Sequence, residues 1–228
     1  MLDYPCPMNT FSVAILFSIL VVIIQPSLAE NNAGRILLES FDQPLHTWEE
    51  MNDPVMGGKS RGTFTIQDGI GKFEGEVVDV PFLHAPGFIQ VRTQQSMKRY
   101  PDVSSCTGLE IVAKQRLDSN NEEGYQGYRI SFGNAHAPGG KYFAYGYKSN
   151  LKGVPSDDFG AVTIPFGEFT DFWDDATGDA IHTCLEDQLY CPDEMTLKNM
   201  GRMAIWGEGV AGNVSLEIKS ITAVGCAE

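Results

Sequence analysis

The chain has 228 residues and is acidic, with 16 Lys and Arg against 30 Asp and Glu and a formal net charge of −14 at pH 7. An acidic surface argues against nucleic acid or an anionic membrane as partner, because both require clustered positive charge. The length is sufficient for one domain with a substantial core.

The first 29 residues predict a cleaved signal peptide. Phe11 to Ile24 is an apolar run of 14 residues without a charge, which suits a signal peptide and is short for a membrane span. Ser27 and Ala29 occupy positions −3 and −1 of a cut after Ala29. The segment before the run has no Lys or Arg, so initiation at Met8 stays open. An uncleaved anchor is the alternative to a cleaved signal peptide. We expect residues 30–228 to form a single domain with no transmembrane span.

After residue 30, short runs of β-branched and aromatic residues alternate with Gly, Pro, Asn and Asp, which predicts an all-β antiparallel sandwich. Asp68-Gly69 predicts a tight hairpin turn, and the segment 192–199, with Asp193 as its cap, predicts one short helix. We expect ten strands, at residues 35–41, 61–67, 70–78, 88–93, 109–114, 125–132, 142–147, 161–165, 202–206 and 214–224.

The connection from Trp48 to Ser60 is the most unusual stretch. Its Gly-Lys-Ser ending imitates a phosphate-binding loop but lacks the first glycine and leads into a strand, so no nucleotide is expected. Two readings stay open: a structural connection with Trp48 packed inward, or a ligand-facing loop in which Trp48, Asn52 and Asp53 bind. Arg92, on an apolar strand, is either a buried ion-pair partner of Asp53 or a ligand clamp.

Four cysteines remain after the leader, and in an oxidising compartment an even number predicts two disulfides. Cys184 and Cys191 are close in sequence and flank a turn. Cys106 opens one predicted strand and Cys226 closes another, so an antiparallel pair of strands brings them together. Zinc at His182 and Cys184 is disfavoured by the ligand spacing. Asn213 starts the one N-glycosylation sequon.

An acidic loop and a group of aromatic residues are candidate binding features. The loop holds Asp171, Asp174, Asp175 and Asp179, which suit calcium as its one candidate cofactor, or a solvated surface. Tyrosines crowd the region 125–147, and Tyr145 and Trp173 are the candidate platforms for a sugar, although about half of such rings belong in a sandwich core.

Catalytic motifs are nearly absent, so no catalytic residue and no enzymatic activity are expected. Glu74 and Glu76 share a strand face and form the one carboxylate pair considered for glycoside hydrolysis. Partners in that reaction usually face each other across a cleft, so a wet strand face is the preferred reading.

The motifs carry a family resemblance. Four segments carry it: the run Asn52-Asp53-Pro54-Val55-Met56-Gly57-Gly58-Lys59-Ser60, the strand 87–93, the strand 103–112 and the element 164–169. Through these segments, about residues 38–224 resemble the complex I intermediate-associated protein 30 kDa family. The resemblance implies a galactose-binding-like jelly-roll sandwich and a chaperone-like role in assembling respiratory complex I in mitochondria. The leader, the cysteines, the sequon and Pro86 in place of a family glycine depart from it.

We therefore expect a non-enzymatic binding or scaffolding module, secreted or held in the endomembrane lumen, whose partner is a glycan or a protein. The alternative is an assembly factor for a membrane complex in a mitochondrion or complex plastid. A glycoside hydrolase is the minor alternative.

Overall fold

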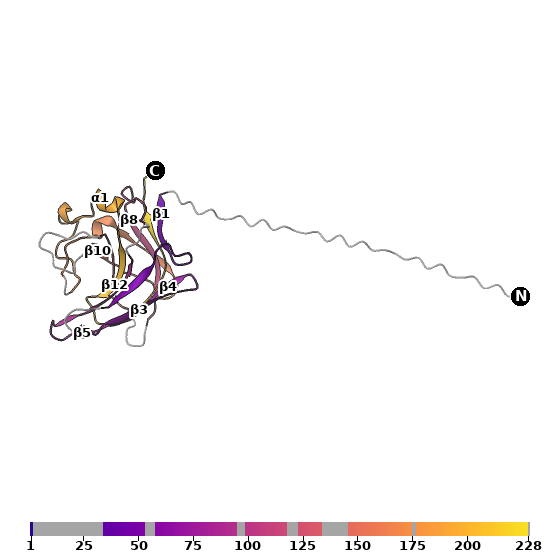
Figure 1. The fold of residues 1–228 in the computed structure, drawn as a ribbon, viewed down its shortest axis with the longest axis horizontal. Coiled ribbons are helices and arrows are strands. Elements are labelled where there is room, and N and C mark those ends of the chain that lie inside the picture. Colours follow the sequence, from indigo (N-terminus) through magenta and orange to yellow (C-terminus); the bar gives the residue numbers. More distant parts are fainter. Residues whose placement is uncertain are drawn as a thin grey trace. The chain divides into compact units, whose positions relative to one another are not determined.

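The computed structural model describes residue 1 and residues 34–52, 58–94, 99–117, 123–133, 146–174 and 177–227. The predicted signal peptide, residues 1–29, thus lies almost entirely outside the described residues. The chain divides into two compact units, Met1–Asn31 and Asn32–Glu228. The strands that the structure describes belong to the second unit (Figure 1).

One sheet is antiparallel and has six strands, in the order β11, β8, β13, β4, β3, with β1 also paired to β13. The long β13 lies inside this sheet and connects its parts. It pairs with β8 along one edge, and with β4 and then β1 along the other. The strands are β1 (Arg35–Ser40), β3 (Arg61–Gln67), β4 (Ile70–Val77), β8 (Gly108–Gln115), β11 (Gly160–Pro165) and β13 (Gly212–Val224).

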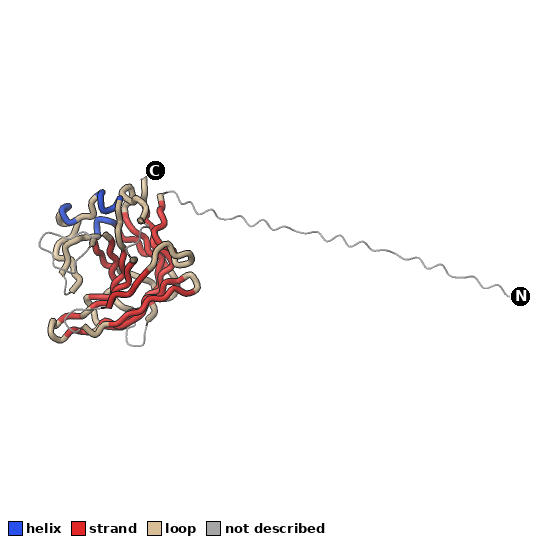
Figure 2. The backbone as a smooth tube through the Cα atoms, in the orientation of Figure 1, coloured by secondary structure: helices blue, strands red, loops and turns tan. Residues whose placement is uncertain are grey.

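The second sheet is also antiparallel and has the order β10, β9, β12, β7, β2. Its strands are β2 (Trp48–Asn52), β7 (Phe88–Thr93), β9 (Tyr128–Phe132), β10 (Tyr147–Asn150) and β12 (Met203–Glu208). A two-stranded ribbon consists of β5 (Asp79–Val80) and β6 (Ala85–Pro86). The short helices η1 (Phe166–Glu168), η2 (Gln188–Tyr190) and α1 (Glu194–Lys198) gather at one end (Figure 2).

The two sheets are buried differently, and the difference positions the site. In β9, Tyr128, Ile130 and Phe132 belong to the core. Arg129 and Ser131 alternate with them and therefore face the other side, yet both are buried too. By contrast, β3 is mostly exposed. The second sheet is therefore covered on its outer side around β9, where polar side chains lie beneath the cover.

The predicted sandwich is confirmed, with most of its strands at or near the expected positions. Asp68 and Gly69 form the predicted turn with φ of 54° and 76°, as a tight hairpin requires. The helix α1 is confirmed as well, and the Asp193 side chain accepts a hydrogen bond from the Thr196 N–H.

Three expectations need correction. The Trp48–Asn52 segment was expected to be a connection but is the edge strand β2, which its pairing with β7 imposes on a sequence without β-branched residues. The strand expected from residue 125 begins at Tyr128, where the pairing of β9 with β12 starts, and the Tyr125 hydroxyl donates to the Val210 carbonyl at 2.8 Å. The strand expected at 142–147 overlaps β10 only at Tyr147, because β10 continues to Asn150, and residues 142–145 lie outside the described residues.

The structure joins both predicted cysteine pairs, Cys106–Cys226 and Cys184–Cys191. Gly108 of β8 pairs with Val224 of β13, so the start of one strand meets the end of the other beside the first disulfide. In the described part of the chain, no helix has the length and apolar character needed to cross a membrane.

Candidate functional site

A pocket of about 280 Å³ lies where β10, at the edge of one sheet, and β11, at the edge of the other, meet the loop that follows η1. Apolar, hydroxyl, amide and charged side chains share its wall. The residues that line it are Arg129, Lys148, Ser149, Asn150, Lys152, Val162, Thr163, Ile164, Glu168, Thr170, Trp173, Gly178, Ala180, Thr183 and Leu185.

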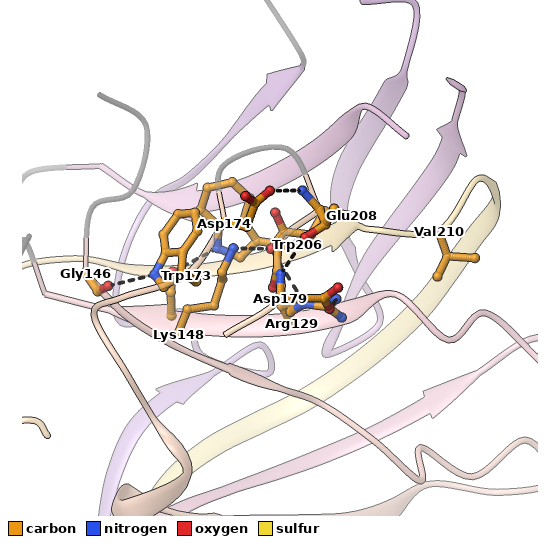
Figure 3. A network of polar contacts seen from close by, with 12 residues as sticks. Arg129, Gly146, Lys148, Trp173, Asp174, Asp179, Trp206, Glu208 and Val210 are labelled. Carbon is orange, nitrogen blue, oxygen red and sulfur yellow. Dashed lines mark hydrogen bonds and ion pairs between the residues drawn. The ribbon is translucent and has the colours of Figure 1, made fainter. Parts of the chain in front are cut away.

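Lys148 is the central charged group of this wall and is 97 % buried, with a relative exposure of 3 %. Its Nζ lies 2.5 Å from Oε1 of Glu208, 3.2 Å from the centroid of the Trp173 ring and 5.1 Å from that of Trp206. Figure 3 shows the ammonium group beside the Trp173 ring. A carboxylate and two indole rings thus replace the water that a buried ammonium group loses.

Arg129 is the second buried cation, with a relative exposure of 6 %. Its Nε donates to the Gly178 carbonyl at 3.1 Å and lies 3.9 Å from Glu208 Oε1. Its Nη2 donates to Asp179 Oδ1 at 3.4 Å (Figure 3). Glu208 therefore serves two buried cations at once.

The strand register assembles this cluster. Trp206 of β12 stands opposite Arg129 of β9, and Lys148 of β10 stands opposite Ser131. Trp206 Nε1 donates to Ser131 Oγ at 2.8 Å. Because side chains alternate along a strand, these residues share the outer face of the second sheet.

The loop that covers this face is held by backbone and disulfide bonds. Lys148 and Thr170 exchange backbone hydrogen bonds of 2.8 and 3.1 Å, and Trp173 forms a β-bridge with Ala180. The disulfide Cys184–Cys191 closes the next segment, which begins with the pocket residues Thr183 and Leu185. Backbone hydrogen bonds, a β-bridge and a disulfide thus hold this covering loop in place, rather than a long helix or strand.

A smaller hollow of about 200 Å³ lies beside Gln115, Tyr125 and Tyr128. Burial, with the Glu208 carboxylate as a second cause, raises the pKa of Tyr125 far above its usual value. The phenol therefore stays protonated and serves as a hydrogen-bond donor to Val210.

Comparison with known proteins identifies the family and the fold. The sequence profile of complex I intermediate-associated protein 30 matches residues 39–182. The chain belongs to this family. The matched region contains Arg129, Lys148 and Trp173 and ends before Trp206 and Glu208, so it covers part of the cluster. A comparison with curated protein sequences finds no match.

Solved structures share the fold of this family member at low sequence identity. One is the family 11 carbohydrate-binding module from Clostridium thermocellum in complex with a β-1,3-1,4-mixed-linked tetrasaccharide, with 14 % identity, 86 % of this chain and 98 % of that chain covered, and a TM-score of 0.51. Another is the family 11 module of the cellulosomal cellulase Lic26A-Cel5E of Clostridium thermocellum, with 15 % identity, 86 % and 96 % covered, and a TM-score of 0.50. The galactose-binding-like jelly-roll fold is therefore shown.

The candidates from the Trp48–Ser60 segment have structural contacts in this family member and do not line the pocket. Trp48 Nε1 donates to Glu39 at 3.0 Å. The Asn52 side chain bonds both the N–H and the carbonyl of Gly62, at 2.6 and 3.3 Å, and so joins β2 to β3. Asp53 lies outside the described residues.

Arg92 and Trp173 have different surroundings from those expected. Arg92 Nε lies 3.0 Å from Glu49 Oε1 on the neighbouring strand β2. Trp173, a candidate platform for a sugar, is buried, because its ring packs on Lys148 and its Nε1 donates to the Gly146 carbonyl at 3.4 Å. It still lines the pocket, whereas Tyr145 lies outside the described residues.

The acidic loop is partly committed to protein contacts. Asp174 Oδ1 accepts a hydrogen bond from the Thr177 N–H, Asp179 pairs with Arg129, and Asp171 is buried. Asp175 lies outside the described residues. Among the residues that the structure describes, no group of three or more His, Cys, Asp or Glu is placed to hold a metal, and calcium stays a prediction.

Glu74, Glu76 and Asn213 lie on the other sheet and are exposed. Neither carboxylate lines the pocket, and Glu74 instead has Arg116 at 3.9 Å. Asn213 stands opposite Glu76, and its glycosylation stays a prediction.

The sequence analysis missed Arg129, Lys148, Trp206 and Glu208. One sequence signal could have found Arg129. A charged residue inside an apolar strand made Arg92 a candidate, and Arg129 in Tyr-Arg-Ile-Ser-Phe has the same pattern. The pairing of these four residues depends on strand order, which spacing in the sequence does not reveal.

Proposed function

We propose that residues 30–228 form a non-catalytic binding module whose ligand is a glycan, bound in the pocket between β10 and β11. The pocket itself carries this proposal. Its wall combines hydroxyl and amide groups, such as those of Ser149, Asn150 and Thr163, with the exposed apolar side chain of Leu185. Sugars present the same mixture of hydroxyl groups and apolar ring faces. The volume is near the lower end for small-ligand sites, about 300 Å³.

The fold similarity supports this choice of ligand. A carbohydrate-binding module of the same fold has been solved with a bound tetrasaccharide. Fold alone does not assign function, so the support comes from the conjunction of that fold with a polar pocket. The exposed Glu74 and Glu76, which do not face each other across this pocket, give no comparable support to hydrolysis.

We further propose that the module works in the secretory pathway or outside the cell, after cleavage behind Ala29. Two disulfides agree with an oxidising compartment, because cytosolic proteins rarely keep them.

The second candidate is a scaffold that binds a protein, as an assembly factor does. Family membership favours it, and so do exposed apolar side chains on the segment around the Cys184–Cys191 disulfide. They are Ile181, Leu185, Leu189 and Met195. Acidic residues lie among them in the sequence, so a partner with apolar and basic groups would fit.

The test uses protein with both disulfides formed, applied to a glycan array and followed by calorimetry. Exposed pocket residues are changed in Asn150→Ala and Thr163→Ala, with Thr65→Ala on β3 as the matched exposed control. Each lost hydrogen bond should weaken binding by up to about tenfold, and the control should bind normally. A blank array, combined with a partner protein whose binding is lost in Leu189→Asp, would favour the scaffold instead.

A further inference from the structure

We propose that the glycan is acidic, and that Arg129 and Lys152 recognise a carboxylate or sulfate group on it. This inference deepens the proposed function and rests on it. The first observation is the charge of the pocket wall. The chain as a whole carries a net charge of −14, yet the described residues of the wall include Arg129, Lys148 and Lys152 and one carboxylate, that of Glu168. The net charge of the described wall residues is therefore positive, opposite in sign to the net charge of the chain.

The second observation is an incomplete set of partners for Arg129. A guanidinium group has five N–H donors. The Nε and Nη2 donors go to Gly178 and Asp179, but no described residue accepts a hydrogen bond from Nη1. The side chain is more than nine-tenths buried and lines the pocket, so this donor is available to an acceptor group on a ligand.

The carboxylates near Arg129 do not occupy this donor. Glu208 lies 3.9 Å from Nε and also accepts a hydrogen bond from Lys148. The Asp179 side chain is 74 % exposed, and water weakens an ion pair at such a position. A carboxylate or sulfate of a ligand would bond Nη1 without displacing either residue.

Neutral sugars usually stack on an open aromatic face. Trp173 is the aromatic residue of the described wall, and it has a relative exposure of 4 % with Lys148 Nζ over its ring. The wall thus offers a sugar cations and hydroxyl groups rather than an open ring. Charge-assisted hydrogen bonds from Arg to an oxyanion are the strong interactions available there.

The test measures binding to matched pairs of polysaccharides by calorimetry. One pair is polygalacturonate and its methyl ester, and the other is a sulfated carrageenan and neutral agarose. We expect the charged member of at least one pair to bind about tenfold more tightly. The preference should shrink at about 0.5 M salt, because exposed charges are screened. The two pairs distinguish a carboxylate from a sulfate.

Variants assign the preference to the pocket. Arg129→Lys keeps a positive charge but loses the planar guanidinium group with its paired N–H donors. It should weaken binding of the acidic polysaccharide about tenfold or more. Lys152→Gln removes an exposed cation at the pocket and should weaken it about threefold. Lys59→Gln, exposed and outside the pocket wall, is the matched control. Lys152→Gln keeps the test decisive even if Arg129→Lys does not fold.

Two results overturn the inference, and they differ. Equal binding of neutral and charged members, or full affinity in both pocket variants, contradicts the acidic ligand and leaves the glycan proposal standing. No binding to any polysaccharide in either pair or on the array contradicts the glycan proposal itself.

Discussion

Four hydrogen-bond donors converge on the Glu39 carboxylate, which is fully buried. Oε1 accepts from the Ser40 and Leu45 N–H groups at 3.0 and 2.7 Å, and Oε2 lies 3.0 Å from both His46 Nδ1 and Trp48 Nε1. The carboxylate thereby fastens the chain between β1 and β2. A buried acceptor with this many partners is expensive to alter.

We predict that Glu39→Gln lowers the free energy of unfolding by about 3 kcal/mol, because an amide NH₂ then faces the Trp48 N–H donor. Urea unfolding of the variant and the parent measures it. Glu74→Gln, exposed on β4, is the control and should change stability by less than about 0.5 kcal/mol. Equal midpoints for Glu39→Gln and the parent would contradict the role assigned to this carboxylate.

Two lysines in the pocket wall allow the stability effect of a buried lysine to be compared with that of an exposed one. Lys148 is buried against Glu208 and Trp173, whereas Lys152 is exposed. We predict that Lys148→Met costs about 2–4 kcal/mol, because Glu208 loses one of its two cations inside the protein. Lys152→Met should be nearly neutral to stability. Thermal and urea unfolding report both, and similar losses in the two variants would refute the buried pair as a stabilising contact.

At the scale of elements, the two disulfides have different tasks. Cys106–Cys226 spans 120 residues and ties β8 to the end of β13, whereas Cys184–Cys191 spans 7 residues next to the pocket wall. Chain-entropy arguments make the longer loop the more stabilising, by about 5 kcal/mol against about 2.5 kcal/mol.

We predict that replacing each pair by serine separates stability from binding. Cys106→Ser with Cys226→Ser should lower the unfolding free energy more and leave ligand affinity unchanged in the folded fraction. Cys184→Ser with Cys191→Ser should lower the unfolding free energy less but weaken ligand binding, because the disulfide no longer holds the pocket residues Thr183 and Leu185 in place. Calorimetric binding and urea unfolding on both variants measure this. The opposite pattern would show that the stapled segment does not shape the pocket.

At the scale of the whole molecule, the two disulfides agree with an oxidising compartment. We predict that a full-length chain with a C-terminal tag enters the secretory pathway and has a mature N-terminus at Glu30. N-terminal sequencing and reducing versus non-reducing mass measurement test this. Import of the intact chain into an organelle with free cysteines would instead support the assembly-factor alternative.

The fold was largely predictable from the sequence, and the pocket was not. Period-two alternation, the Asp68-Gly69 turn and the Asp193 cap are local features, and each acts through neighbours in the chain, so the strands, the hairpin and the helix followed from them. Both disulfides were predictable as well, because strand ends and short spacing restrict which cysteines can meet.

Tertiary structure alone decided which polar residues came together. Arg129, Lys148 and Glu208 lie on three strands whose order in the sheet no local pattern encodes. Trp173, a candidate platform for a sugar, is buried in the fold and packs against Lys148. Local sequence determined most of the secondary structure because those forces act over a few residues, whereas β2 depends on its pairing with β7. The site required the long-range register of β9, β10 and β12, and that register is decided when the whole sandwich packs.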